Sequence, residues 1–183
     1  MNVRRWVKIT PMEVIVDGMC LETKATGAAL LTELYRNHAN DYPKFFKMDE
    51  LSKLGFIAAE LLLKGEDENH AEREDRAVIL FNRSSSICND RKYQDTISRA
   101  DDFFPSPSIF VYTLPNIVTG EIAIRHHYYG ETAFYVLDEP DETLIQQVIA
   151  AAFADDTTTS VLTGWVDCET HDNFYAHIYI IDK

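Results

Sequence analysis

The chain has 183 residues, of which 46% are hydrophobic and 26% are charged. This composition is typical of a globular protein, and the length suits one domain over residues 1–183 with a full core. Lys and Arg number 17 against 30 Asp and Glu, which gives a formal net charge of −13. A surface this acidic repels phosphate backbones and anionic lipids, so we expect neither a nucleic-acid nor a membrane partner.

Three cysteines, Cys20, Cys88 and Cys168, lie far apart and form no CxxC pair. Their odd number and their spacing argue against a disulfide framework and against a recognisable zinc motif, and they favour a reducing cytoplasm. The N-terminal residues MNVRRWVKIT are not followed by the apolar core of a signal peptide, and no run of about 20 apolar residues occurs. The sequence therefore predicts no exported or membrane-spanning form.

The first half of the chain predicts alternating strands and helices. Helix 49–64 has apolar residues at helical spacing, with Asp49 as N-cap and Gly65 as the stop. The charge run 66–76 (EDENHAEREDR) lacks an apolar face and predicts a solvated, mobile loop. In chain order, the remaining expectations are one or two strands over 6–16, a helix over 27–38, a doubly covered strand over 77–81, a polar loop over 82–89 and a helix over 90–99.

The second half continues this alternation, which favours an α/β fold. In helix 116–126 the residues Glu121 and Arg125 are spaced as an i,i+4 ion pair. A loop over 103–107 precedes this helix. Beyond it we expect a strand over 133–137, a helix over 141–155, and strands over 160–166 and 174–181. The strands 77–81, 133–137 and 160–166 should be interior or near-interior in one sheet, and strand 174–181 should pair with that sheet and complete the domain.

One motif resembles a known family. The segment PSIFVYTLPNIVTGEIAIR at 107–125, followed by GET at 130–132, is similar to the β-ketoacyl synthase pattern of a proline-led segment, PN, an IAI helix and a glycine turn. Residues 49–63 also resemble an early helix of that family, and VLTGWVD at 161–167 resembles the strand that ends its first half. The resemblance implies a single thiolase-like half, with a mixed β-sheet and helices on both faces.

The same resemblance implies that the condensing machinery is missing. In the family a cysteine nucleophile lies at a helix N-terminus, where backbone N–H groups favour the thiolate. An ungapped count between Gly130 and Asp167 places Glu139 at this position, and no cysteine lies between Cys88 and Cys168. A carboxylate cannot form the required acyl thioester. The family's other catalytic residues, two histidines and a lysine, belong to a second half. We therefore assign no catalytic, cofactor or metal residue and expect no condensation activity.

Each polar feature also has a structural interpretation. Glu139 and Asp141 could simply stabilise the first turn of helix 141–155, with Pro140 at its N1 position. His126 and His127 suit a helix C-terminus better than a metal site. His171 and His177, with Cys168 nearby, suggest zinc but lack a fourth ligand at a recognised spacing, and the serines at 84–86 lack the glycines and lysine of a phosphate-binding loop.

The sequence thus predicts a ketosynthase-like, non-catalytic accessory subunit associated with fatty-acid, polyketide or aryl-polyene-type synthesis. It should form a homodimer, or a heterodimer with a ketosynthase, through strand 133–137 or the apolar helix 141–155, which needs cover on more than one side. The alternative is a small decarboxylase or hydrolase that binds acyl thioesters or an acyl carrier protein and uses Glu139 or a histidine. An acidic carrier protein would need a basic patch, and the basic clusters at 4–5 and 91–92 are small.

Overall fold

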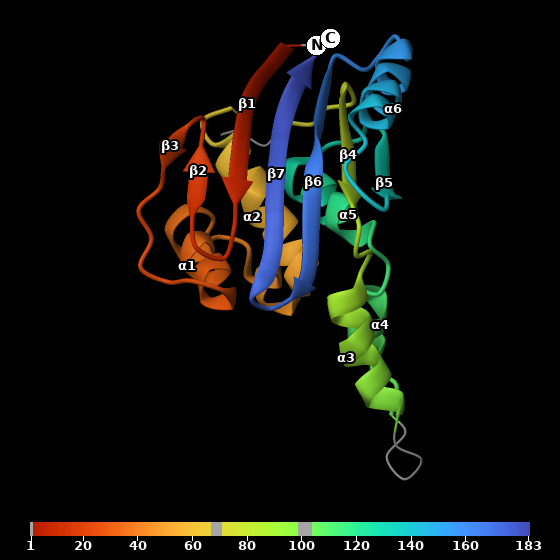
Figure 1. Ribbon diagram of the computed structural model, residues 1–183. Coiled ribbons are helices and arrows are strands. Elements are labelled where there is room, and N and C mark those ends of the chain that lie inside the picture. The colour runs from red at the N-terminus through yellow and green to blue at the C-terminus, as the bar shows by residue number, and fades with distance from the viewer. Residues whose placement is uncertain (1, 67–70, 99–103) are drawn as a thin grey trace.

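The computed structural model describes residues 2–66, 71–98 and 104–183 (Figure 1). These residues form a seven-stranded sheet with the order β3-β2-β1-β7-β6-β4-β5. The strands are β1 (Asn2–Ile9), β2 (Val14–Val16), β3 (Met19–Cys20), β4 (Arg76–Asn82), β5 (Thr132–Val136), β6 (Ser160–Thr170) and β7 (Asn173–Asp182). The helices are α1 (Ala28–His38), a 3-10 helix η1 (Pro43–Lys47), α2 (Glu50–Leu63), α3 (Ile87–Ile97), α4 (Pro107–Val111), α5 (Ile117–His126) and α6 (Glu142–Ala154).

The sheet is mixed, as the sequence predicted. Strands β1, β7 and β6 pair antiparallel, whereas β4 runs parallel to both of its neighbours, β6 and β5. Every residue of β4 is buried, which explains its continuous apolar run, because a strand covered on both faces has no polar side. The carboxyl ends of β4, β5 and β6 consequently lie at the same end of the sheet, and the loops that follow these three strands begin there.

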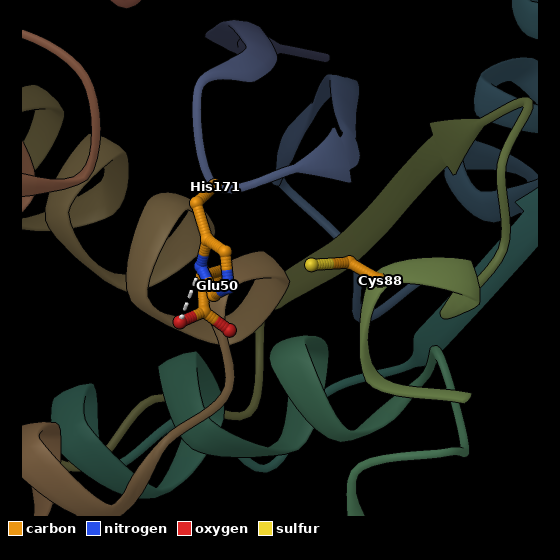
Figure 2. Close-up of side chains that lie close together, drawn as sticks. All are labelled: Glu50, Cys88 and His171. Atoms are coloured by element: carbon orange, nitrogen blue, oxygen red, sulfur yellow. Dashed lines mark ion pairs between the residues drawn. The ribbon is translucent and has the colours of Figure 1, made fainter. Parts of the chain in front are cut away.

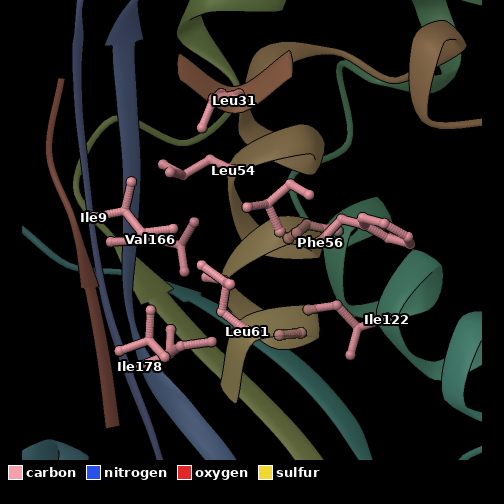
Figure 3. Close-up of a cluster of buried hydrophobic side chains, with 14 of the residues drawn as sticks. Ile9, Leu31, Leu54, Phe56, Leu61, Ile122, Val166 and Ile178 are labelled. Carbon is pink, nitrogen blue, oxygen red and sulfur yellow. The ribbon is translucent and has the colours of Figure 1, made fainter. Parts of the chain in front are cut away.

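Helices cover both faces of the sheet, but unequally. The larger core lies between one face and the helices α1, α2 and α5, with Ile9, Val166 and Ile178 from the sheet facing Leu54 and Leu61 of α2 (Figure 3). On the opposite face α6 packs over β4, β5 and β6, where Ile149 and Ala152 meet Ile79 and Phe81. None of the helices that the described residues form is long and apolar enough to cross a membrane.

Helix α2 is the centre of the larger core. The Asp49 carboxylate caps it by accepting a hydrogen bond from the Ser52 amide at 3.0 Å, as predicted. A Cβ placed on Gly55 would lie 2.3 Å from the Cγ2 of Val118, so this glycine permits the close approach of α5. The buried α2 therefore fixes the positions of both of its ends, including the first turn that carries Glu50.

The C-terminal strand lies inside the sheet. Strand β7 pairs with β1 on one side, from Asn2↔Asp182 to Ile9↔Ala176. On the other side it pairs with β6, from Ser160↔Asp182 to Thr170↔Asn173. Both ends of the described chain therefore lie side by side at the same edge of the sheet (Figure 1). This confirms that strand 174–181 pairs with the sheet.

Two sequence expectations about strands and loops need correction. Strand β5 lies in the same sheet as β4 and β6 but is its outermost strand, so the prediction of a near-interior position is wrong. The charge run 66–76 is not wholly a solvated loop, because Arg76 begins β4 with a side chain only 1% exposed. Its guanidinium donates to Glu66, Tyr128 and Ser160. Residues 67–70 of this run lie outside the described residues.

Two expectations about helices also change. Helix α3 begins at Ile87, three residues before the predicted start, and takes in the end of the predicted polar loop. Glu121 and Arg125 do not form the predicted ion pair, because both side chains turn toward other segments. Glu121 pairs with Lys44 at 2.8 Å, and Arg125 pairs with Glu60 at 2.9 Å and with Asp41 at 2.7 Å.

Candidate functional site

The β5–α6 connection contains Glu139, the residue that the sequence count places at the family's nucleophile position. Strand β5 ends at Val136, and the Leu137 amide continues its pairing by donating to the Asn82 carbonyl at 2.8 Å. The Asp141 carboxylate caps α6 by accepting from the Leu144 amide at 3.1 Å. The connection therefore crosses the carboxyl edge of the parallel strands, where ligand sites of open α/β sheets are commonly found.

Glu139 lies in this connection and is exposed. It contributes to an open surface depression formed by residues 136–142 and Leu144. Among the described residues its carboxylate makes no hydrogen bond or ion pair, and the depression is open to solvent, so the local geometry provides no enclosed pocket for an acyl chain. The assignment of Glu139 to the family's nucleophile position remains a prediction from the sequence count.

The structural interpretation of residues 139–141 is confirmed only in part. Asp141 is the N-cap of α6, and Glu142 is the acidic residue of its first turn. Pro140 precedes the cap, so the prediction that it occupies the first helical position is wrong. The stabilising carboxylates are thus those of Asp141 and Glu142, and helix formation does not require Glu139.

Helix α6 is better covered than its composition suggested. Its large apolar side chains are all at least half-buried: Leu144, Ile145, Val148, Ile149 and Phe153. All of these except Leu144 contact the core beside β4 and β6. The outer face of the helix carries the glutamines at 146–147 and the small side chains of Ala150, Ala151 and Ala154. The argument that this helix must find a second cover to bury large apolar groups is therefore wrong.

The four histidines considered as possible metal ligands fall into three separate environments. His126 lies at the end of α5, with Nε2 3.2 Å from Glu60, and His127 caps that helix in a left-handed conformation. His177 faces the α6 side of the sheet, with its ring edge-on to Trp6 and Tyr179. His171 lies in the β6–β7 turn, with Nδ1 3.2 Å from Glu50. The suggested grouping of His171 with His177 is therefore wrong.

Sequence reasoning missed the cluster that His171 does join. Cys88, Glu50 and His171 place their ligand atoms within 4.8 Å of one another. A hydrogen bond with Cys168 lowers the pKa of the Cys88 thiol, whereas the same bond and burial raise the pKa of Cys168. Burial raises the pKa of Glu50, but the hydrogen bond and charge of Lys92 outweigh it, and the pKa is lowered. The residues are too distant in sequence for any spacing rule to detect them.

The two basic clusters are engaged within the chain. Arg4 pairs with Glu66 at 2.6 Å, and Arg5 pairs with Asp17 at 3.0 Å. Arg91 donates to the Glu169 carbonyl at 3.1 Å, and Lys92 pairs with Glu50. Because these cations already have partners, neither cluster offers a free basic patch for an acidic protein.

Comparison with solved structures identifies the fold. A structure described as the ishigamide ketosynthase/chain length factor superposes with a TM-score of 0.72 over 99% of this chain and 61% of the other, at 15% sequence identity. A ketosynthase (ApeO) in complex with its chain length factor (ApeC) from Xenorhabdus doucetiae gives a TM-score of 0.66 over 100% and 78%, at 11% identity. A β-ketoacyl synthase from Burkholderia phymatum gives 0.55 over 80% and 45%, at 15% identity.

The class that these similarities define is the thiolase-like, ketosynthase-like α/β fold, which confirms the fold implied by the sequence motif. No protein-family model matches the sequence, and no curated protein matches it. At 11–15% identity the similarity establishes the fold and not the activity. The chain spans about three fifths of the ishigamide protein that it matches.

Proposed function

We propose that this chain is a non-catalytic accessory subunit that pairs with a ketosynthase through the open edge of β5. The observation that carries the proposal is the position of β5 as the outermost strand of the sheet. Among the described residues, no strand pairs with its outer side. An unpaired strand edge is a template for another chain.

The hydrogen-bond pattern shows which groups of β5 face outward. The Val78 amide donates to the Glu131 carbonyl, and the Leu137 amide donates to the Asn82 carbonyl, each at 2.8 Å. Bonds to one neighbour come from alternate residues along a parallel strand. The backbone groups of Thr132, Phe134 and Val136 therefore point away from β4 and are available to a partner strand.

The side chains beside this edge also suit an interface. Tyr135 is 36% exposed and Val136 is 48% exposed, which places two sizeable apolar groups along a strand that has an open side. The nearby α6 presents Ala150, Ala151 and Ala154, whose small side chains permit close approach. A partner could thus bury apolar surface while it extends the sheet.

The solved structures support this type of partner. One of them contains a ketosynthase together with its chain length factor, and another contains a type II polyketide ketosynthase together with its acyl carrier protein. By analogy with these assemblies, the partner of this chain would be a ketosynthase of polyketide, aryl-polyene or fatty-acid synthesis. The engaged basic clusters give no support to direct docking of a carrier protein.

The test is co-purification of the tagged chain with full-length ketosynthases from the same organism, followed by light scattering to establish the composition of the complex. Val136→Lys should abolish capture, because it places a charge on the open edge. The matched control is Ile124→Lys, which replaces a 62% exposed apolar residue on α5 and should leave capture unchanged. Capture that survives Val136→Lys, or capture of no ketosynthase, would contradict the proposal.

A turnover assay tests the proposal that the chain is not a catalyst. The pure chain should turn over neither malonyl nor longer acyl thioesters, because the connection at Glu139 holds no thiol nucleophile and no enclosed pocket. Turnover that is lost on Glu139→Ala would favour the alternative decarboxylase or hydrolase. The capture experiment and the turnover assay therefore separate the two functions.

A further inference from the structure

Three segments that are distant in sequence bring Glu50, Cys88 and His171 together (Figure 2). Glu50 is the first residue of α2, Cys88 is the second residue of α3, and His171 lies in the turn that joins β6 to β7. This cluster lies apart from the β5–α6 connection and plays no part in the proposed function. Its position depends on the buried α2 and on the β6–β7 hairpin, which hold the side chains in place.

The separations suit a single metal ion. All the ligand atoms lie within 4.8 Å of one another, and Glu50 Oε1 lies 3.2 Å from His171 Nδ1. Bonds of about 2.0–2.3 Å in a tetrahedral site hold ligand atoms roughly 3–4 Å apart. Small side-chain rotations would therefore close the cluster around an ion.

The residue types are also those of a transition-metal site. Carboxylate oxygen, thiolate sulfur and imidazole nitrogen are all zinc ligands, whereas magnesium and calcium prefer oxygen alone. Cys88 is 7% exposed and lies in the first turn of α3, where the helix dipole favours its thiolate. The buried thiol of Cys168 is beside it and can hydrogen-bond to the sulfur.

A second layer of contacts orients the carboxylate. Lys92 pairs with Glu50 Oε2, which leaves Oε1 directed at His171. The Glu50 side chain is 14% exposed, whereas that of His171 is 53% exposed. The cluster is thus closed on the protein side and open at the histidine, which provides an entry path and leaves room for a water ligand.

We propose that Glu50, Cys88 and His171 form a binding site for a divalent transition-metal ion of the zinc type, with a fourth position open to water. Such an ion would link the first turns of α2 and α3 to the β6–β7 turn. In this region the ion pairs of Glu50 and the bond from Arg91 to the Glu169 carbonyl already connect these segments. A chain with the site filled should therefore be more stable than one without metal.

Cobalt(II) titration of the metal-free protein tests the site, because a cobalt–thiolate bond gives a near-ultraviolet charge-transfer band. We expect the band to saturate at one ion per chain and to disappear when zinc is added. Cys88→Ser should abolish the band, and His171→Ala or Glu50→Gln should weaken cobalt binding at least tenfold, in line with the loss of one ligand or its support. Zinc should raise the melting temperature of the unmodified chain but not that of His171→Ala. Because the His171 side chain is exposed, this variant should fold normally without metal.

Two variants serve as matched controls. Cys20→Ser replaces an exposed cysteine on β3, and His177→Gln replaces a histidine on the opposite face of the sheet. Both should keep the band and the affinity of the unmodified chain. Absence of a charge-transfer band, its survival in Cys88→Ser, or its loss in Cys20→Ser would overturn the proposal. Circular dichroism of each metal-free variant verifies that the comparison is made between folded chains.

Discussion

Gly164 shows how one residue controls the pairing of two central strands. It lies in β6 with φ at +139°, a conformation that side-chain-bearing residues rarely adopt. A Cβ at this position would lie 2.2 Å from the His177 carbonyl oxygen and 2.6 Å from the Ile178 Cα. Both neighbours are backbone atoms of β7, which cannot turn aside as a flexible side chain could.

Gly164→Ala should therefore destabilise the chain by at least about 1–3 kcal/mol, the cost of a strained backbone conformation, before the clash is added. Urea unfolding monitored by tryptophan fluorescence measures the effect. Gly120→Ala is the control, because Gly120 lies within α5 and an added Cβ meets nothing within 4 Å. That change should stabilise by up to about 1 kcal/mol through helix propensity. Equal effects of the two changes would show that the β6–β7 contact is not the cause.

Arg76 shows that a buried charged side chain needs partners from several segments of the chain. Its buried guanidinium donates to Tyr128 and Ser160 at 3.0 Å each and to Glu66 at 2.5 Å. A buried charge is tolerated only with partners of this kind. Composition marked residues 66–76 as a solvated run, because a sequence pattern counts charges and does not reveal which of them find partners across the sheet.

Strand β7 is the element on which the sheet depends most. It pairs with β6 along its whole length and with β1 from Ala176 to Asp182. Its residues Phe174, Ala176, Ile178 and Ile180 contribute to the larger core. Without it, β1, β2 and β3 would lose their connection to the rest of the sheet.

Deletion of residues 174–183 should therefore leave the chain insoluble or unfolded, because two strand interfaces and part of the core disappear together. Circular dichroism and size-exclusion chromatography of the expressed truncation measure the outcome. Deletion of Lys183 alone is the control, since it removes only the bonds to the Thr159 and Asp155 carbonyls. A soluble, cooperatively folding 1–173 fragment would refute the central role of β7.

At the scale of the whole molecule, stability should depend on pH through a half-buried histidine. Burial lowers the pKa of His177 from its usual value of 6.5, and the nearby charge of Lys8 lowers it further. The unfolded chain then binds a proton at a higher pH than the folded chain does. The contribution of His177 to stability is therefore complete above about pH 6.5 and is lost as the pH falls from there through the folded-state pKa.

We expect the urea midpoint to fall between pH 7.5 and pH 5.5, and His177→Gln should reduce that fall because glutamine does not titrate. Urea unfolding of the unmodified chain and of His177→Gln at matched ionic strength isolates the contribution of the histidine to the pH dependence. Tyr129→Gln, which replaces an exposed aromatic residue, is the control and should keep the pH dependence of the unmodified chain. If the urea midpoint of His177→Gln falls with pH as steeply as that of the unmodified chain, other groups cause the pH dependence.

The sequence by itself determined most of the elements and the class of fold. Apolar periodicity located α2 and α6, continuous apolar runs located β4 and β6, and Asp49 and Asp141 marked helix starts. These signals are local, since a helix or strand requires its own residues to face a core at the correct period. The motif at 107–125 then indicated the thiolase-like arrangement, which the structural comparison confirmed.

Only the tertiary structure decided which segments meet. The edge position of β5, the burial of Arg76 and the partners of Glu121 and Arg125 all depend on strand order and helix packing. The cluster of Glu50, Cys88 and His171 joins residues separated by 38 and 83 positions. No local pattern encodes such a meeting, because it arises from the crossover of α2 behind the sheet and from the register of the β6–β7 hairpin, which long-range pairing sets.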